Sequence, residues 1–219
     1  MSDDAPPRPG LQERLAATGA ELSALVAVAR RLIEVAVTAE APPDAVRTAT
    51  AAVARAVDAL APFVPTVPAF RYAFGDAFTG PHDLMPFDPI MGRLSPLAPP
   101  LEITFEDGRA VGRVRFDSPY EGPPGCVHGG VIALAFDQVL NVANLMAGAA
   151  GPTKSLALRF RRPTPLRAEL VFEGWQEKVD GTRLQARGRL RAGDVVTVEA
   201  EGTFVLLSSD RVMQLLPPR

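Results

Sequence analysis

The sequence predicts an α+β fold in which a curled antiparallel sheet surrounds one long helix. Residues 131–150 form an apolar run of helical length without proline. Segments in which apolar and polar residues alternate precede and follow this run, as expected for strands. A helix that is apolar nearly all round must be buried. The order of elements therefore places the helix inside the curve of the sheet.

The N-terminal part of the chain predicts a helical hairpin. Residues 1–10 are rich in proline and aspartate and are expected to form a disordered tail. Residues 11–40 carry apolar side chains at helical spacing, prolines follow at 42 and 43, and a second helical pattern ends before Pro62. We assign residues 11–61 to the hairpin. Its apolar side also offers a face for a partner helix.

The remaining chain divides into three parts. Residues 62–94 are rich in proline and aromatic side chains, and so long a stretch without regular structure is expected to wrap over the core. Residues 95–208 contain the predicted sheet and helix, and residues 209–219 form a C-terminal tail. Within 95–208 the alternating segments predict a hairpin that turns at 107–108 and, after the helix, four strands: 156–160, 169–179, 182–191 and 195–207.

Composition excludes several classes of function. Hydrophobic residues make up 47% of the 219 residues, charged residues 22%, and the net charge is −2. Without a basic cluster, and with only 6% aromatic residues, the chain is not expected to bind nucleic acid. The lone Cys126 excludes disulfides within the chain and a cysteine-based metal cage. His82 and Asp83 are too few ligands for a metal, so we expect no metal and no cofactor.

The location of the protein is expected to be cytoplasmic. A single cysteine fits a reducing compartment, and the acidic N-terminus is not followed by the apolar core of a signal peptide. Residues 131–150 are long enough to span a bilayer. Asp137 and three amide side chains near the middle of this segment argue against lipid on all sides. We therefore predict a buried core helix and no membrane span.

The run from Gly125 to Gly130, Gly-Cys-Val-His-Gly-Gly, indicates a site at the start of the long helix. Its two final glycines should leave free N–H groups at the positive end of the helix, which suit an oxyanion or an acyl carbonyl. Asp137 follows about two turns later, and an ionised carboxylate in such a helix is costly unless it is paired or useful. Asp137, Asn141 and Asn144 share one face by spacing.

These residues resemble the hotdog-fold thioesterases, in particular the PaaI-like acyl-CoA thioesterase group. The resemblance covers about half of the chain, from Pro96 to Leu206. Asp137 stands nine residues after His128, where this group carries its catalytic acid. The segments that match the family pattern are Ser95–Pro100, Tyr120–Gly130 and Arg159–Leu166.

The resemblance implies an enzyme that hydrolyses acyl-CoA thioesters, with active sites at the interface of a homodimer whose sheets pair edge to edge. Dimers of this kind often assemble into tetramers. By this analogy Asp137 acts as general base or nucleophile on a thioester held by the other subunit. The backbone N–H of Gly130, with that of Gly129, would hold the oxyanion. His128 would orient the loop or the substrate carbonyl.

The same resemblance suggests substrate-binding residues. Arg161 and Arg162 are candidates for the phosphates of Coenzyme A, since the arginine fork suits phosphate. Because the two arginines are adjacent, they point to alternate faces of a strand or turn, and at most one of them should reach a ligand. Asn141 lies one turn beyond Asp137 and could narrow the acyl channel. Gln138 and Asn141 depart from the family pattern, and they leave open a non-hydrolytic protein that binds acyl-CoA or lipid.

Structural roles remain open for several of these residues. Asp137 could pair with an arginine across a dimer interface, and His128 could hold its turn by hydrogen bonds alone. Gly129 and Gly130 could serve close packing of the helix. Cys126 is interpreted as a small buried residue, because no base is placed to activate it. A hydratase is disfavoured, because no second histidine lies near the helix.

Overall fold

The protein is described by a computed structural model that covers residues 11–65, 81–99, 101–149 and 151–206. The predicted tails, 1–10 and 209–219, and residues 66–80 of the predicted wrapping segment lie outside this range. The elements in chain order are α1 (Leu11–Thr38), α2 (Pro43–Leu60), η1 (Ala61–Phe63), α3 (Pro81–Leu84), β1 (Glu102–Glu106), β2 (Arg109–Val114), η2 (Ser118–Tyr120), α4 (Gly129–Met146), β3 (Thr153–Phe160), β4 (Leu170–Asp180), β5 (Arg183–Ala192) and β6 (Val195–Val205).

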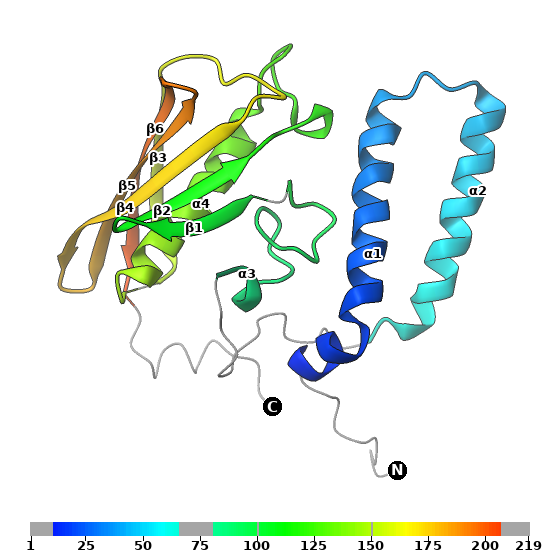
Figure 1. The fold of residues 1–219 in the computed structure, drawn as a ribbon, viewed down its shortest axis with the longest axis horizontal. Helices are drawn as coiled ribbons and strands as arrows, with labels where there is room; N and C mark the ends of the chain where they lie inside the picture. The colour runs from blue at the N-terminus through cyan, green and yellow to red at the C-terminus, as the bar shows by residue number, and fades with distance from the viewer. Residues whose placement is uncertain (1–10, 66–80, 100, 150, 207–219) are drawn as a thin grey trace, which may run out of the picture.

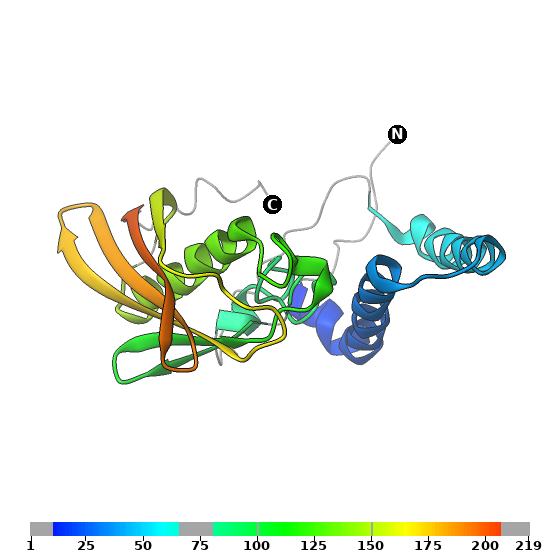
Figure 2. The ribbon, with the colours of Figure 1, turned by 90° about the horizontal axis from the view of Figure 1, so that it is seen from above.

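One antiparallel sheet in the order β1-β2-β4-β5-β6-β3 curls around α4 (Figures 1 and 2). This confirms the predicted α+β fold and the N-terminal helices. The central helix begins two residues before the predicted start because His128 caps it, and it ends before Gly148, which has a φ of +83°. Only α4, among the described residues, is long and apolar enough to cross a membrane. Half of α4 is buried by the sheet, as expected for a core helix.

Glycines on three neighbouring strands let α4 lie close to the sheet. The Leu140 side chain packs over Gly174 of β4, Gly188 of β5 and Gly202 of β6. A Cβ atom on Gly188 would lie 2.7 Å from the carbonyl oxygen of Glu173 and 3.1 Å from Leu140 Cδ2. Side chains at these positions would therefore push the helix and sheet apart.

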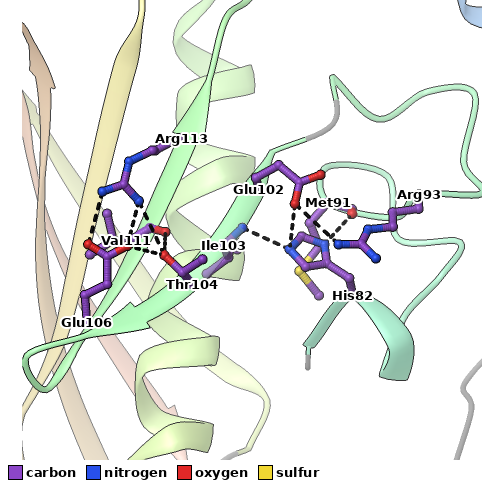
Figure 3. A network of polar contacts seen from close by, with 9 residues as sticks. All are labelled: His82, Met91, Arg93, Glu102, Ile103, Thr104, Glu106, Val111 and Arg113. Atoms are coloured by element: carbon purple, nitrogen blue, oxygen red, sulfur yellow. Dashed lines mark hydrogen bonds and ion pairs between the residues drawn. The ribbon is translucent and has the colours of Figure 1, made fainter. Parts of the chain in front are cut away.

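The segment before the sheet covers the β1 edge (Figure 3). Ile90 and Met91 are buried in the core, and the Leu101 N–H donates to the Ile90 carbonyl over 3.2 Å. The buried His82 accepts the Ile103 N–H at Nε2 over 2.9 Å, so its ring proton is on Nδ1, which lies 3.0 Å from the Met91 carbonyl. The edge of β1 thus has its outward N–H groups at 101 and 103 satisfied.

The opposite edge of the sheet is open. All residues of β3 are exposed or only half-buried, and β6 is its single partner strand in the described chain. An uncovered strand of eight residues is a template for pairing with another strand.

The convex face of the sheet is polar and internally paired. Glutamates project from β1, β4 and β6, and arginines project from the strands beside them. Arg113 binds Glu106 over 2.7 Å and Arg187 binds Glu177 over 2.8 Å. The Arg113 guanidinium and the Thr104 hydroxyl lower the pKa of Glu106 to about 2. This face therefore carries its own charge partners.

The two N-terminal helices differ in their contact with the rest of the molecule. α1 buries Val26, and Arg30 donates to the carbonyls of Gly92 and Ser95 at 3.0 and 2.8 Å. α2 has no buried residue and is the outermost element in both views (Figures 1 and 2). Asp44, the expected start of the second helix, lies one residue inside it, after Pro42 and Pro43.

The close approach of α4 makes a stability prediction. Replacement of Gly188 by alanine should lower the free energy of unfolding by about 1–3 kcal/mol, because its Cβ overlaps backbone. In contrast, Gly19→Ala in α1 meets nothing within 4 Å and should raise stability by about 0.5–1 kcal/mol. Urea unfolding of both variants measures this contrast. A stable Gly188→Ala protein would show that the sheet can yield here.

Candidate active site

The loop that enters α4 is held in one conformation by backbone contacts. The His128 N–H donates to the Tyr120 carbonyl, and the Val127 N–H donates to the Thr164 carbonyl, each over 2.9 Å. Gly122 lies so close to His128 that a Cβ atom would be 2.8 Å from its Cα. Gly125 has a φ of +73°, a conformation that favours glycine. The Gly-rich sequence therefore fixes the position of the helix N-terminus.

The first turn of α4 contains one free donor. His128 Nδ1 accepts the Gly130 N–H over 3.0 Å, so the neutral ring carries its proton on Nε2. The N–H groups of Val131 and Ile132 donate to the His128 carbonyl. The Gly129 N–H has no hydrogen-bond acceptor in the described part of the chain. Gly130, the predicted oxyanion donor, is thus engaged with His128, whereas Gly129 is available.

Asp137 is held by a residue that the sequence analysis did not single out. The Thr153 hydroxyl, at the start of β3, donates to Asp137 Oδ1 over 2.6 Å. The ladder between β3 and β6 is irregular between Thr153 and Ser155. Sequence periodicity does not reveal such an irregularity, and sixteen residues separate the two partners. The only local signal is a hydroxyl residue at the first position of the strand after the helix.

The amides beside Asp137 have different environments. Asn141 is half-buried on the same side of α4 as Asp137. Asn144 is fully buried and accepts a hydrogen bond from Gln176 over 3.1 Å, so it is a core residue rather than part of an open stripe. Gln138 is buried against Met85, with its Nε2 3.5 Å from the sulfur.

A groove of about 450 Å³ opens at the helix N-terminus, between the entry loop and the end of β3. Its walls include Gly129, Ile132 and the ring of Phe160, which would meet a Cβ on Gly129 at 3.3 Å. The two predicted arginines both line the groove but differ in their partners. Arg161 binds Glu199 over 2.6 Å. Arg162 has no side-chain partner among the described residues.

The carboxylate and the donor are too far apart to act on one carbonyl group. Seven residues separate Gly130 from Asp137, which corresponds to a rise of about 10 Å along a helix. A catalytic base must reach its proton within about 3 Å, directly or through one water. A single chain therefore contains both groups without bringing them together. No group of three or more potential metal ligands occurs among the described residues.

Comparisons with known proteins identify the family of the chain. Residues 124–201 match the family model described as the thioesterase superfamily. A solved structure of a thioesterase superfamily protein is 34% identical, covers 84% of this chain and 94% of that chain, and has a TM-score of 0.73. The chain belongs to the thioesterase superfamily. The predicted resemblance to the hotdog-fold thioesterases is confirmed at this level.

Curated members of the superfamily match the region of the site. Acyl-coenzyme A thioesterase THEM4 of Bos taurus is 33% identical over 96 residues, which are 42% of this chain and 39% of that protein. Acyl-coenzyme A thioesterase THEM5 of Homo sapiens is 31% identical over 87 residues, 40% of this chain and 35% of that protein. The chain thus matches less than two fifths of the length of these relatives.

The capping role of His128 can be tested apart from catalysis. The variant His128→Ala loses the acceptor for the Gly130 N–H and should lower the free energy of unfolding by about 0.5–2 kcal/mol. The variant His128→Asn should recover most of this stability, because asparagine is a good N-cap. Urea denaturation at neutral pH measures both. Equal stability of all three proteins would contradict the capping role.

Proposed function

We propose that this member of the thioesterase superfamily hydrolyses acyl-CoA thioesters. The names of its curated relatives support this class of substrate. One observation carries the proposal: Asp137 is held at the first residue of β3, and the free Gly129 N–H lies beside Phe160 at the last. The two halves of an active site thus stand at opposite ends of one exposed edge strand.

Pairing of β3 with the same strand of a second copy would join these halves. In an antiparallel pair centred between Leu156 and Ala157, residue 153 of one copy stands opposite residue 160 of the other. Asp137 and Thr153 of one copy then come level with Gly129 and Phe160 of its partner. The two-fold axis creates two equivalent sites. The covered β1 edge and the open β3 edge favour a homodimer of this kind.

The chemistry of the proposed site follows from the polar groups that are not engaged in hydrogen bonds among the described residues, Asp137 Oδ2 and the Gly129 N–H. Thr153 occupies Oδ1 of Asp137, which leaves Oδ2 to accept a proton from the attacking water. Water adds to the thioester carbonyl, and the oxyanion is held by the Gly129 N–H of the partner subunit. Movement of the His128 ring would release the Gly130 N–H to donate to the same oxygen. Collapse of the tetrahedral intermediate expels the CoA thiolate, which takes up a proton, and releases the carboxylic acid.

Direct attack by Oδ2 is the other use of the same carboxylate. In that case Asp137 forms a mixed anhydride with the acyl group and expels the CoA thiolate, and water then hydrolyses the anhydride. Both routes need a carboxylate at 137 and a donor at the helix N-terminus.

A non-hydrolytic acyl-CoA-binding protein is the second candidate. Gln138, one of the two departures that suggested it, contacts Met85 of the wrapping segment rather than the carboxylate. Asn141 lies one turn from Asp137 on the same side of α4 and continues to support this candidate.

The primary test measures thiol release from short, medium, long and aromatic acyl-CoAs. The variant Asp137→Asn should lower kcat by about 10²–10⁴-fold, the range of a lost general base. Thr153→Val should lower kcat less, and Thr153→Ser should restore it because it keeps the hydroxyl. Asp180→Asn, an exposed carboxylate paired with Lys178, is the control. Tight binding of acyl-CoA without turnover in the wild type would favour the second candidate.

The different partners of the two arginines predict different effects on KM. Arg162→Gln should raise KM for acyl-CoA about 10–150-fold, since a charge-assisted bond to phosphate contributes about 1.5–3 kcal/mol. Arg161→Gln removes an ion pair with Glu199 and should leave KM unchanged. Acyl-pantetheine, which has no phosphate, should show no effect of Arg162→Gln. An equal rise in KM for both thioesters would place Arg162 away from the phosphates.

A further inference from the structure

The second helix of the hairpin has no packed partner among the described residues. α2 has 18 residues and buries none of them. In proteins most of the stability of a helix comes from packing of an apolar face against other elements. α2 lies at one end of the molecule, beyond α1 and far from the sheet (Figures 1 and 2). In the described part of the chain, α2 therefore has no apolar surface packed against it.

The hairpin holds most of the exposed apolar side chains of the protein. Of the 18 large hydrophobic residues that are exposed in the described chain, 11 fall between residues 25 and 64. On α2 they form one stripe with helical spacing. We name this stripe the hairpin surface; it consists of Val46, Val53, Val57 and Leu60. A contiguous apolar stripe of this kind marks an interaction site.

The charges of the hairpin indicate what can cover this surface. α1 has three acidic and three basic residues, and α2 has two of each, so the hairpin is neutral. Arg31 pairs with Glu34 over 2.7 Å, and Arg47 pairs with Asp44, each within its own helix. A neutral hairpin is not attracted to anionic lipid or nucleic acid. It can meet an identical surface without repulsion between like charges.

The hairpin is not confined to this chain. The solved superfamily structure covers 84% of the chain, whereas residues 95–206 account for only about half of it. The match with a TM-score of 0.73 therefore extends well outside the sheet domain.

We propose that the hairpin surface packs against the hairpin surface of a second copy around a two-fold axis and forms a four-helix bundle. A two-fold contact needs one self-complementary patch, which a neutral apolar stripe supplies. The contact lies at the opposite end of the molecule from β3 (Figures 1 and 2). Both contacts can form together, and they give a closed tetramer when their two-fold axes cross at a right angle.

The test compares molecular masses by sedimentation velocity and light scattering. The double variant Val46→Glu/Val57→Glu places charges at positions that are 51% and 59% exposed, so it should not disturb the packing within one chain. It should halve the mass of the wild-type assembly. The matched control Ala51→Glu/Ala59→Glu adds the same charges to the opposite side of α2 and should keep the wild-type mass. Equal masses for the wild type and the Val46/Val57 variant would overturn the proposal.

Cross-linking identifies the partner of the surface directly. In a Cys126→Ser background, Val57→Cys should give covalent dimers with a short bis-maleimide, and Ala51→Cys should not. Absence of cross-links at 57 contradicts the proposal. The proposal is also contradicted if the wild type floats with phosphatidylcholine vesicles and the Val46→Glu/Val57→Glu protein does not. That result would show that lipid covers the stripe.

The proposed enzymatic activity is tested separately from this contact. Hairpin residues contribute no group to the site at Asp137 and Gly129, so thiol release per site should be equal in the wild type and the dimeric variant. If the substitution halves the mass but the wild type releases no thiol, the hairpin contact is supported and the proposed function is contradicted. If the wild type releases thiol but the mass does not change on substitution, the function is supported and the contact is contradicted.

Discussion

The packing of Leu140 over three glycines fixes the position of α4 against the sheet, and the site depends on that position. Gly174, Gly188 and Gly202 form a shallow track across three strands, and only one side of the helix can enter it. Because Leu140 and its neighbour Val139, which also contacts Gly174, set the rotation of α4 about its axis, the side opposite Val139 must face outward. Gly130 and Asp137 lie on this outward side. The position of the carboxylate is therefore a consequence of core packing.

The two edges of the sheet differ in how their backbone groups are covered. His82 and the backbone of the wrapping segment satisfy the N–H groups of Leu101 and Ile103, so a further strand cannot pair with this part of the edge. The edge of β3 has no such cover in the part of the chain that the structure describes. In addition, the Asp137 carboxylate accepts a hydrogen bond from Thr153, while the N–H donors predicted to act with it lie about 10 Å away along α4. The proposed pairing of β3 with a second copy would cover this edge and bring Asp137 close to the N–H donors of the partner subunit.

Local sequence patterns predicted the elements, because helix and strand periods reflect which side of each segment is buried. The long helix and the alternating strands were readable in this way. The choice between Gly129 and Gly130 as free donor was not, because it depends on the direction of the His128 ring. Thr153 was missed because its contact with Asp137 joins segments that are distant in sequence. The burial of Asn144 beside Gln176 depends on a contact of the same kind, which its position on the helix does not reveal.

The surfaces of this protein fall into two kinds, and the difference argues for where it associates. On the convex sheet face each strand of glutamates lies beside a strand of arginines, and the Arg189 guanidinium lowers the pKa of Glu173. Desolvating such paired charges costs free energy that a new partner must replace. The β3 edge presents backbone groups whose hydrogen bonds a paired strand can supply, and the hairpin surface presents apolar side chains whose burial is itself favourable. Association should therefore use the two ends of the molecule and leave the convex face in water.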